Sequence, residues 1–507
     1  MSRQARLVLD PAFQVGPVDP RLFGSFVEHL GRCVYTGIYE PGHPAADADG
    51  LRTDVLDLVR ELGVTVIRYP GGNFVSAYNW EDGVGPVDQR PSRLDPAWRS
   101  IEPNKFGLGE FMKFLGKLGS VEPMLAVNLG TRGIAEAIQL LEYANHPGGT
   151  AGSDLRVSHG NKDPYGIRLW CLGNEMDGRW QIGHKSADDY GRLAAATAWA
   201  MRLTDPGVEL VACGSSSQAM PTFGAWEDTV LGHAYDLVDH VSMHAYYEEK
   251  DGDRDSFLAS AVAMEAFIGG VAATCDHVAA RLKTSKKIGI SFDEWNVWYS
   301  SKTLDQPVRG WETAPRLLED VYSVTDAVVV GSLLIALLRH ADRVRVACLA
   351  QLVNAIAPIM TEPGGRAWRQ STFYPFALTS RHGRGTVLTA EPESPVIRTA
   401  GHGDVPAVHA TAVLGGENEE VTVFAVNRLR GAPVELLVEF RGLRPTKILE
   451  HQAITDPDED ACNTAAQPSR VAPKPLDGTR MAEGPARIVL PPMSWNMIRF
   501  TTSGQPL

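Results

Sequence analysis

Strand-length apolar runs alternate with helical patterns over the first two thirds of the chain. Eight runs read as strands buried on both faces: residues 22–29, 64–73, 122–130, 167–175, 208–216, 239–247, 287–295 and 346–354. Helices are predicted between them, most clearly over residues 51–63, 108–119, 186–205 and 323–343. Eight β–α repeats in series predict a closed (β/α)8 barrel, with an open doubly wound sheet as the alternative.

The pattern changes near residue 380. From there on, short alternating runs such as EEVTVFAVNR and APVELLVEF are separated by Gly, Pro, Asn and Asp, which predicts an antiparallel, jelly-roll-like β-sandwich. The N-terminal run ARLVLD reads as a lone strand that could join this sandwich. We therefore expect an N-terminal strand segment at 1–18, a catalytic barrel at 19–378 and a sandwich at 379–507, with a long surface loop at 456–483.

Composition and charge narrow the class of protein. Hydrophobic residues make up 44% and charged residues 21%, which is ordinary for a globular protein. The net charge of −13 disfavours nucleic acid or an anionic membrane as a partner. No apolar segment follows the basic N-terminus, and no stretch reads as the roughly 20 apolar residues of a membrane span. The six scattered cysteines are expected to be reduced and buried, so we expect a soluble, cytoplasmic enzyme.

Polar residues end nearly every predicted barrel strand. In a (β/α)8 barrel these carboxyl ends surround the active site, and polar side chains there would be costly without partners if the site were apolar. The residues are Glu28 and His29, Asn73, Asn174 and Glu175, His244 and Tyr246, Asp293 and Glu294, and Gln351 and Asn354.

Glu175 and Glu294 decide the predicted chemistry, because they end the fourth and seventh strands. Two carboxylates across a barrel mouth suit glycoside hydrolysis: a separation of roughly 5–5.5 Å indicates retention of configuration, and roughly 6.5–9.5 Å indicates inversion. Asp293 is expected on the opposite strand face from Glu294, in a structural role. No group of His and carboxylates has catalytic zinc spacing, so neither a metal nor another cofactor is expected.

The motifs WCLGNEMDG and FDEWNVWY resemble the acid/base and nucleophile signatures of clan A retaining glycosidases. More narrowly, the chain is similar to the α-L-arabinofuranosidases of glycoside hydrolase family 51. FGSFVEHLGRCVYTGIYEPGHP, RYPGGNFVSAYNWEDGVGP, NLGTRG, EYANHPGGT and APIMTEPGGRAWRQSTFYPF resemble that family's blocks, in its order. GNE alone is a weak signal, whereas the ordered set is a strong one.

The resemblance implies roles at matching positions. Glu175 would be the general acid/base, which must hold a proton near neutral pH, and Glu294 the nucleophile, which must stay ionised. His244 shares a strand face with Tyr246 and is expected to hydrogen-bond the nucleophile. The positions implied to hold or border the sugar are Glu28, Asn73, Asn174, His244, Tyr246, Gln351, Trp98 and Trp298. The resemblance also implies a homo-oligomer, a hexamer.

The implied activity is release of terminal non-reducing α-L-arabinofuranosyl residues from arabino-oligosaccharides, arabinan or arabinoxylan. Two alternatives stay open: a β-xylosidase or endo-glucanase on the same scaffold, and a non-catalytic carbohydrate-binding barrel. The second predicts loss of a glutamate, and both are present. The preferred linkage and aglycone cannot be read from the sequence.

Overall fold

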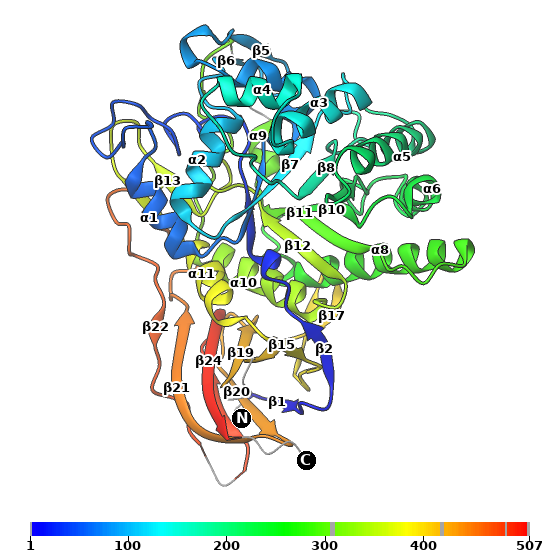
Figure 1. Ribbon diagram of the computed structural model, residues 1–507. Helices are drawn as coiled ribbons and strands as arrows, with labels where there is room; N and C mark the ends of the chain where they lie inside the picture. Colours follow the sequence, from blue (N-terminus) through cyan, green and yellow to red (C-terminus); the bar gives the residue numbers. More distant parts are fainter. Residues whose placement is uncertain (1–2, 305–309, 416–419, 482–483, 504–507) are drawn as a thin grey trace.

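The predicted strands form one closed barrel of parallel strands, which the chain visits in order around the ring (Figure 1). This computed structural model describes residues 3–304, 310–415, 420–481 and 484–503. Each predicted run overlaps one barrel strand: β3 (Gly24–Phe26), β4 (Val66–Tyr69), β7 (Glu122–Val127), β8 (Leu169–Leu172), β9 (Glu209–Ala212), β10 (His240–Tyr247), β11 (Gly289–Val297) and β12 (Val344–Leu349). The (β/α)8 prediction is confirmed.

Helices cover the outside of the barrel, and all four predicted helical segments are present. The α-helices are α1 (Thr53–Leu62), α2 (Leu108–Leu118), α3 (Ile134–Asn145), α4 (Ala151–Ser158), α5 (Ala187–Thr204), α6 (Ala225–Ala234), α7 (Arg254–Leu258), α8 (Ala261–Leu282), α9 (Ser300–Leu304), α10 (Val324–Arg339) and α11 (Phe373–His382). Gly63 ends α1 in the left-handed region at φ 77°, and Ser186 caps α5 by accepting a hydrogen bond from the backbone of Asp189. Short 3₁₀ helices are η1 (Pro20–Phe23), η2 (Asn73–Ala77), η3 (Trp80–Gly83) and η4 (Val87–Gln89).

The barrel interior is a packed core below the carboxyl ends of the strands. Small and branched side chains from alternate strand positions fill it: Phe26, Val66, Met124, Ala126, Leu169, Cys171, Val211, Val346 and Cys348. All six cysteines are free thiols, five of them buried and Cys462 partly buried, largely as predicted. Because the interior is filled, a binding site must lie at an end of the barrel rather than inside it.

Helix α8 corrects the expectation that no stretch is long and apolar enough for a membrane span. By length and composition alone this 22-residue helix could cross a membrane, with a mean hydropathy of 1.2. In the structure it covers the barrel, packing against α6, α10 and β11. Its buried residues recur at three- and four-residue steps, as on the inner face of a barrel helix: Met264, Phe267, Ile268, Val271, Cys275 and Val278.

Two sheets form the second layer of the molecule, below the barrel in Figure 1. A seven-stranded antiparallel sheet has the order β2 (Gln14–Pro17), β15 (Thr386–Leu388), β18 (Val408–Leu414), β19 (Glu420–Asn427), β24 (Ser494–Ser503), β21 (Arg444–Ile454) and β22 (Lys474–Pro475). A three-stranded sheet has the order β1 (Arg3–Leu9), β20 (Val434–Phe440) and β23 (Ala486–Leu490). Apolar side chains from both sheets share one core, as in a sandwich.

Two details of this layer differ from the expectation of a purely antiparallel sandwich with a long loop. The N-terminal strand β1 pairs with β20 in parallel, from Arg3 opposite Val434 to Leu9 opposite Phe440. The segment 456–483 contains β22, and it buries Val471, whose backbone hydrogen-bonds the side chain of Asn463. Because part of this segment is buried, it is more than a surface loop.

Three hairpins complete the fold. They pair β5 (Arg93–Asp95) with β6 (Ser100–Glu102), β13 (Ile359–Thr361) with β14 (Ala367–Arg369), and β16 (Val396–Thr399) with β17 (Gly403–Pro406). The β5–β6 hairpin carries Trp98 in its turn. It therefore connects a predicted substrate residue to the loops above the barrel.

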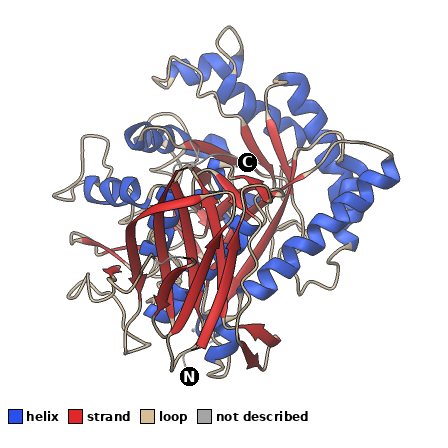
Figure 2. Cartoon of the chain, turned by 90° about the horizontal axis from the view of Figure 1, so that it is seen from below, coloured by secondary structure: helices blue, strands red, loops and turns tan. Residues whose placement is uncertain are grey.

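Helix α10 joins the two layers. It is buried almost all round, as predicted, and contacts α8 and α11 on one side and β18, β19 and β24 on the other. Figure 2 shows the sandwich strands lying in front of the barrel when the chain is seen from below. The contact is close at Gly331, where an added Cβ would stand 2.1 Å from the indole Cδ1 of Trp495. Glycine is therefore required at this helix–sheet crossing.

We expect Gly331→Ala to lower stability and Gly269→Ala in α8 to leave it equal or higher. Alanine favours a helix by about 1 kcal/mol over glycine, but overpacking a core costs about 1–3 kcal/mol. Of these two glycines, only Gly331 faces such a clash, since nothing lies within 4 Å of a Cβ at Gly269. The measurement is the melting temperature of both variants at one scan rate. A stabilised Gly331→Ala variant would contradict the close approach of α10 and Trp495.

Candidate active site

The polar residues predicted at the strand ends meet at one mouth of the barrel. They are Glu28 after β3, Asn174 and Glu175 after β8, His244 and Tyr246 in β10, Asp293 and Glu294 in β11, and Gln351 after β12. Hydrogen bonds connect neighbours around the ring, since Tyr246 reaches Glu294 and Gln351 reaches Glu28. Parallel strands place their carboxyl ends on the same face, so residues distant in sequence become neighbours.

Glu294 has its carboxylate fixed at both oxygens and is only 5% exposed. The Arg68 Nη1 donates to Oε1 over 2.7 Å, and the Tyr246 hydroxyl donates to Oε2 over 2.8 Å. Burial, and next the charge of Glu294, raise the pKa of Tyr246 well above its ordinary value, so the phenol keeps its proton and remains a donor. The carboxylate is thus held in one orientation, as a nucleophile requires.

Glu175 leaves β8 with a φ of 44°, in the left-handed region that few residues other than glycine adopt. Its Oε1 lies 2.8 Å from His244 Nδ1, and its Oε2 accepts a hydrogen bond from Trp180 Nε1 at 2.6 Å. Trp180, half-exposed beside the carboxyl group, was not among the residues predicted from the sequence. Its place five residues after Glu175, in a turn rather than a strand, gave no periodic signal.

The two glutamates stand close together. One carboxylate oxygen of Glu175, one of Glu294 and a ring nitrogen of His244 all lie within 4.8 Å of one another. Inverting glycosidases need roughly 6.5–9.5 Å between their carboxyl groups, to admit a water, whereas retaining enzymes need roughly 5–5.5 Å. The separation matches the retaining arrangement.

His244 lies between the carboxylates as a buried cation. Its Nδ1 is 2.8 Å from Glu175 Oε1, and its Nε2 is 3.0 Å from Asp293 Oδ1. Burial alone would lower the pKa of His244, but the charge of Glu294 and the hydrogen bonds to Asp293 and Glu175 outweigh it and raise the pKa to about 10. The expected hydrogen bond to the nucleophile is wrong in detail: Nδ1 bonds the opposite glutamate and lies 3.6 Å from Glu294 Oε2.

Arg68 is the central residue that the sequence reasoning missed. It lies in β4 with 1% exposure, donating to Glu294 and, over 2.6 Å, to Asn174 Oδ1. Its guanidinium also covers the ring of Phe26 at 4.9 Å. A signal was present, because an arginine within an apolar strand is rarely buried without an ionic partner.

Asp293 corrects a further expectation, that it faces away from Glu294. Its carboxylate contacts His244 and lies 3.7 Å from Arg68 Nε, so it shares the interior with Glu294. The alternation of strand faces fails here because β11 has an irregular register against β12 between Phe292 and Trp295. Burial raises the pKa of Asp293, but Arg68 and His244 more than compensate and lower it below its ordinary value.

Glu28 forms a second buried acidic position beside this cluster. It accepts hydrogen bonds from the backbone of Phe74 at 2.9 Å, from Trp98 Nε1 at 2.8 Å and from Gln351 Nε2 at 2.9 Å. Burial, opposed by the Phe74 hydrogen bond and supported by the charge of Glu294, raises the pKa of Glu28 to about 8. An added Cβ at Gly71 would stand 2.4 Å from Glu28 Cγ, so that glycine makes room for the side chain.

Several buried polar atoms around the mouth have no hydrogen-bond partner among the described residues, and Asn174 Nδ2, Gln351 Oε1 and Trp298 Nε1 are among them. Trp298 also packs edge-on against Tyr246, with ring centroids 5.2 Å apart. Asn73, partly buried, begins η2, and its carbonyl accepts a bond from Gln181 Nε2 at 3.5 Å. Buried donors and acceptors without partners are costly, and a ligand rich in hydroxyl groups would satisfy them.

Glu175, His244 and Glu294 are close enough to bind a metal ion through one atom each. The charges near these three residues do not favour the binding of a metal ion. Arg68 already pairs with Glu294, and the raised pKa of His244 gives its ring a proton in place of a free lone pair. The cluster is better suited to proton transfer and nucleophilic attack than to holding a dication.

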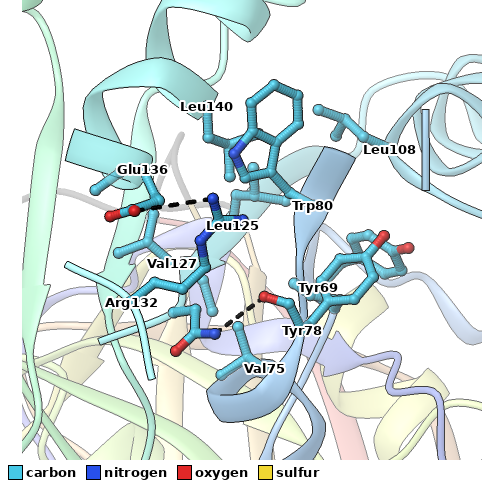
Figure 3. A pocket seen from close by; sticks show the side chains of 14 residues that line it. Tyr69, Val75, Tyr78, Trp80, Leu108, Leu125, Val127, Arg132, Glu136 and Leu140 are labelled. Carbon is cyan, nitrogen blue, oxygen red and sulfur yellow. Dashed lines mark hydrogen bonds and ion pairs between the residues drawn. The ribbon is translucent and has the colours of Figure 1, made fainter. Parts of the chain in front are cut away.

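A small cavity elsewhere in the barrel wall is unrelated to this chemistry. Figure 3 shows its lining, where Tyr69 and Leu125 from the strands meet Trp80 and Leu140 from the outer layer. Its volume of about 30 Å³ holds one or two waters, too few for a sugar. None of the clustered carboxylates lines it.

A (β/α)8 barrel with two adjacent buried carboxylates on β8 and β11, one of them paired with arginine and tyrosine, defines a retaining glycoside hydrolase. Comparison with known proteins specifies which kind. Models of the α-L-arabinofuranosidase 1 domain and the α-L-arabinofuranosidase C-terminal domain match residues 58–260 and 293–494. The chain belongs to the α-L-arabinofuranosidases of glycoside hydrolase family 51.

Several relatives cover nearly the whole chain. An intracellular exo-α-(1→5)-L-arabinofuranosidase of Streptomyces lividans is 66% identical over 99% of this chain and 77% of its own length. An exo-α-(1→6)-L-arabinofuranosidase of Bifidobacterium longum is 56% identical over 98% of this chain and 97% of its own. The solved structure of a family 51 α-L-arabinofuranosidase from Bifidobacterium longum superposes with a TM-score of 0.94 at 48% identity, covering 99% of this chain and 100% of that one.

The raised pKa of His244 predicts a pH dependence of stability. A histidine with pKa about 10 when folded and about 6.5 when unfolded stabilises the fold fully below pH 6.5, and this contribution falls as pH rises toward 10. The free energy of unfolding of the wild type relative to His244→Gln should therefore fall by up to about 1.4 kcal/mol per pH unit between those values. Denaturant titrations at several pH values measure it. His277→Gln on α8, where the side chain is 69% exposed, is the control for removing an imidazole from the surface. A difference between wild type and His244→Gln that is independent of pH would contradict the buried imidazolium.

Proposed function

We propose that this chain is an exo-acting α-L-arabinofuranosidase that cleaves terminal non-reducing arabinofuranosyl residues with net retention. The observation that carries the proposal is the pair Glu175 and Glu294, with one oxygen of each within 4.8 Å and both joined to His244. A non-catalytic barrel would not need to bury two carboxylates and their cations at such cost. The alternatives of β-xylosidase and endo-glucanase have no support among the relatives described above.

The reaction follows from the geometry as two displacements. Glu175 gives its proton to the glycosidic oxygen while the Glu294 carboxylate attacks the anomeric carbon; the C–O bond breaks and a glycosyl ester forms. Glu175, now ionised, then removes a proton from water, and the water oxygen attacks the same carbon and expels Glu294. Arg68 and Tyr246 hold the carboxylate oxygens of Glu294, and His244 bonds Glu175 and lies 3.6 Å from Glu294 Oε2.

The other predicted residues are proposed to bind the furanose. The unpaired amide atoms of Asn174 and Gln351 suit sugar hydroxyls, and Glu28 offers an acceptor beside them. Trp98 and Trp298 supply apolar ring faces for the C–H side of the sugar. Asn73 at the start of η2 is proposed to complete the set.

The natural substrates are proposed to be arabino-oligosaccharides and the arabinosyl side chains of arabinan or arabinoxylan. The relatives are named for both 1→5 and 1→6 linkages, so the linkage is a property to measure. Because three of the most similar relatives are named intracellular enzymes, we also propose an intracellular location and short, imported substrates.

The test is hydrolysis of p-nitrophenyl α-L-arabinofuranoside and β-D-xylopyranoside by wild type, Glu175→Ala and Glu294→Ala. The wild type should prefer the arabinofuranoside. Glu294→Ala should lose about 10⁴-fold or more of kcat, because no covalent intermediate can form. Glu175→Ala should lose about 10²–10⁴-fold in kcat/KM on an arabino-oligosaccharide, whose leaving group needs the acid, and less on the nitrophenyl substrate.

Azide separates the two roles. It attacks a glycosyl ester without needing a general base, so it should restore turnover to Glu175→Ala and yield an arabinosyl azide of unchanged configuration. Glu294→Ala should not give that product. Glu393→Ala, 74% exposed on the sandwich, serves as the control and should behave as wild type. If the wild type preferred the xyloside, the proposed substrate would be wrong. Full activity of either active-site variant would overturn the catalytic role assigned to that glutamate.

We further propose that the protein assembles as a homohexamer, as the family resemblance implies. The expected mass in solution is six times the 55.1 kDa of one chain, about 330 kDa. Light scattering coupled to gel filtration measures it directly. A mass of one or two chains at micromolar concentration would exclude the hexamer and leave the active-site proposal unaffected, because every clustered residue belongs to one chain.

A further inference from the structure

A second concave site lies at the opposite end of the barrel from the catalytic mouth. It opens among the amino-terminal ends of β10, β11 and β12 and the loops that lead into them, with a volume of about 270 Å³. None of the residues assigned above to catalysis or to the furanose lines it.

The cleft is cationic although the chain as a whole carries a net charge of −13. Four of its side chains are basic, Lys286, Lys287, Arg343 and Arg345, against two carboxylates, Asp239 and Asp342. The ion pairs of the described residues account for only part of this charge. Arg343 pairs with Asp276 at 2.8 Å, and Asp239 pairs with Arg202 at 2.6 Å.

Three of the four cations have no carboxylate partner among the described ion pairs. Lys286 donates instead to the backbone carbonyls of Val238 at 2.6 Å and Asp236 at 3.3 Å, and burial lowers its pKa. Arg345 donates to the backbone carbonyl of Asp342 at 3.2 Å. Lys287 is exposed at the rim. Their charges are therefore available to an anion.

His240, the first residue of β10, faces the same cleft and is 5% exposed. Its Nε2 bonds Glu209 Oε1 at 2.7 Å. This hydrogen bond, together with Arg21, lowers the pKa of Glu209 to about 2 despite burial, so the glutamate is an anion beside the ring. The other ring nitrogen, Nδ1, is buried without a hydrogen-bond partner among the described residues.

Gly289 keeps the approach to that nitrogen open. A Cβ at this position would stand 2.4 Å from His240 Nδ1 and 3.0 Å from Arg345 Cγ. Any other residue would close the space between the ring and the cleft. His240 Nδ1 is therefore an unpaired polar atom that faces the cleft near Arg345.

We propose that this cleft binds a small oxyanion, the phosphate group of either inorganic phosphate or a phosphorylated sugar. A guanidinium offers two parallel donors to such a group, and a lysine adds a point charge. The volume leaves room for a pentose attached to the phosphate. The site goes beyond the glycosidase activity and uses none of its residues.

The test is isothermal titration at neutral pH and low ionic strength with sodium phosphate, sodium sulfate and ribose 5-phosphate, and with ribose as the uncharged control. Wild type should bind phosphate and sulfate with one site per chain. The double variant Lys287→Met, Arg345→Met should bind at least tenfold more weakly. The matched double variant Arg444→Met, Lys447→Met removes the same charge from exposed positions of β21 and should bind within twofold of wild type.

The outcomes separate the two sources of the anion. Ribose 5-phosphate binding at least tenfold tighter than phosphate would identify a phosphorylated sugar, and equal affinities would identify the free oxyanion. Arabinofuranoside hydrolysis without added anion should be unchanged in both double variants, which shows that they are folded. The proposal is overturned if no titrant saturates up to about 10 mM, or if the two double variants weaken binding equally. Either result is independent of the glycosidase assignment.

Discussion

The catalytic mouth depends on a charge cluster that is buried and almost entirely self-neutralised. Burying charge costs several kcal/mol per ion unless partners and hydrogen bonds compensate. Here Arg68 and His244 supply two positive charges, and Asp293 and Glu294 supply two negative charges within hydrogen-bonding or ion-pair distance. Glu175, which also bonds His244, is the fifth member. The charges of the other four members cancel one another, which makes their burial tolerable.

Most of the fold follows from the local pattern because each barrel element repeats it. A strand buried on both faces reads as a continuous apolar run, and a covering helix reads as a stripe, so all eight strands and the segments around α1, α2, α5 and α10 could be predicted. The sequence pattern did not predict how strands that are far apart in the sequence pair with each other. The direction of β1 against β20 is set by where the chain enters the sandwich, and neither strand carries that information. Helix α8 was not identified as a long apolar segment, because its larger apolar residues are separated by alanines and glycines. Its mean hydropathy is nevertheless high enough for a membrane span.

The positions of the site residues could be predicted better than their partners. Barrel topology alone places the ends of β8 and β11 at one mouth, which is why Glu175 and Glu294 could be paired from the sequence. Hydrogen-bond partners depend on displacements of a few ångströms that strand counting does not capture. His244 bonds Glu175 because β10 shifts register against β11 between Ser242 and His244. The irregular register of β11 likewise turns Asp293 inward, against the simple alternation of strand faces.

We propose that the unpaired polar atoms around the mouth give the site its selectivity for a sugar. Asn174 Nδ2, Gln351 Oε1 and Trp298 Nε1 are buried without partners among the described residues, although Asn174 and Gln351 are each fixed through their other amide atom. A ligand that supplies hydroxyl groups at those points satisfies them, whereas one that lacks a hydroxyl leaves a desolvated donor or acceptor unpaired. A site built to hydrogen-bond a hydroxyl rejects the analogue without it far more strongly than an apolar pocket rejects a missing methylene. Under this proposal, discrimination between a furanose and a pyranose rests on the fixed directions of these two amides. Arg68 of the charge cluster holds Asn174 in place, and Glu28 holds Gln351.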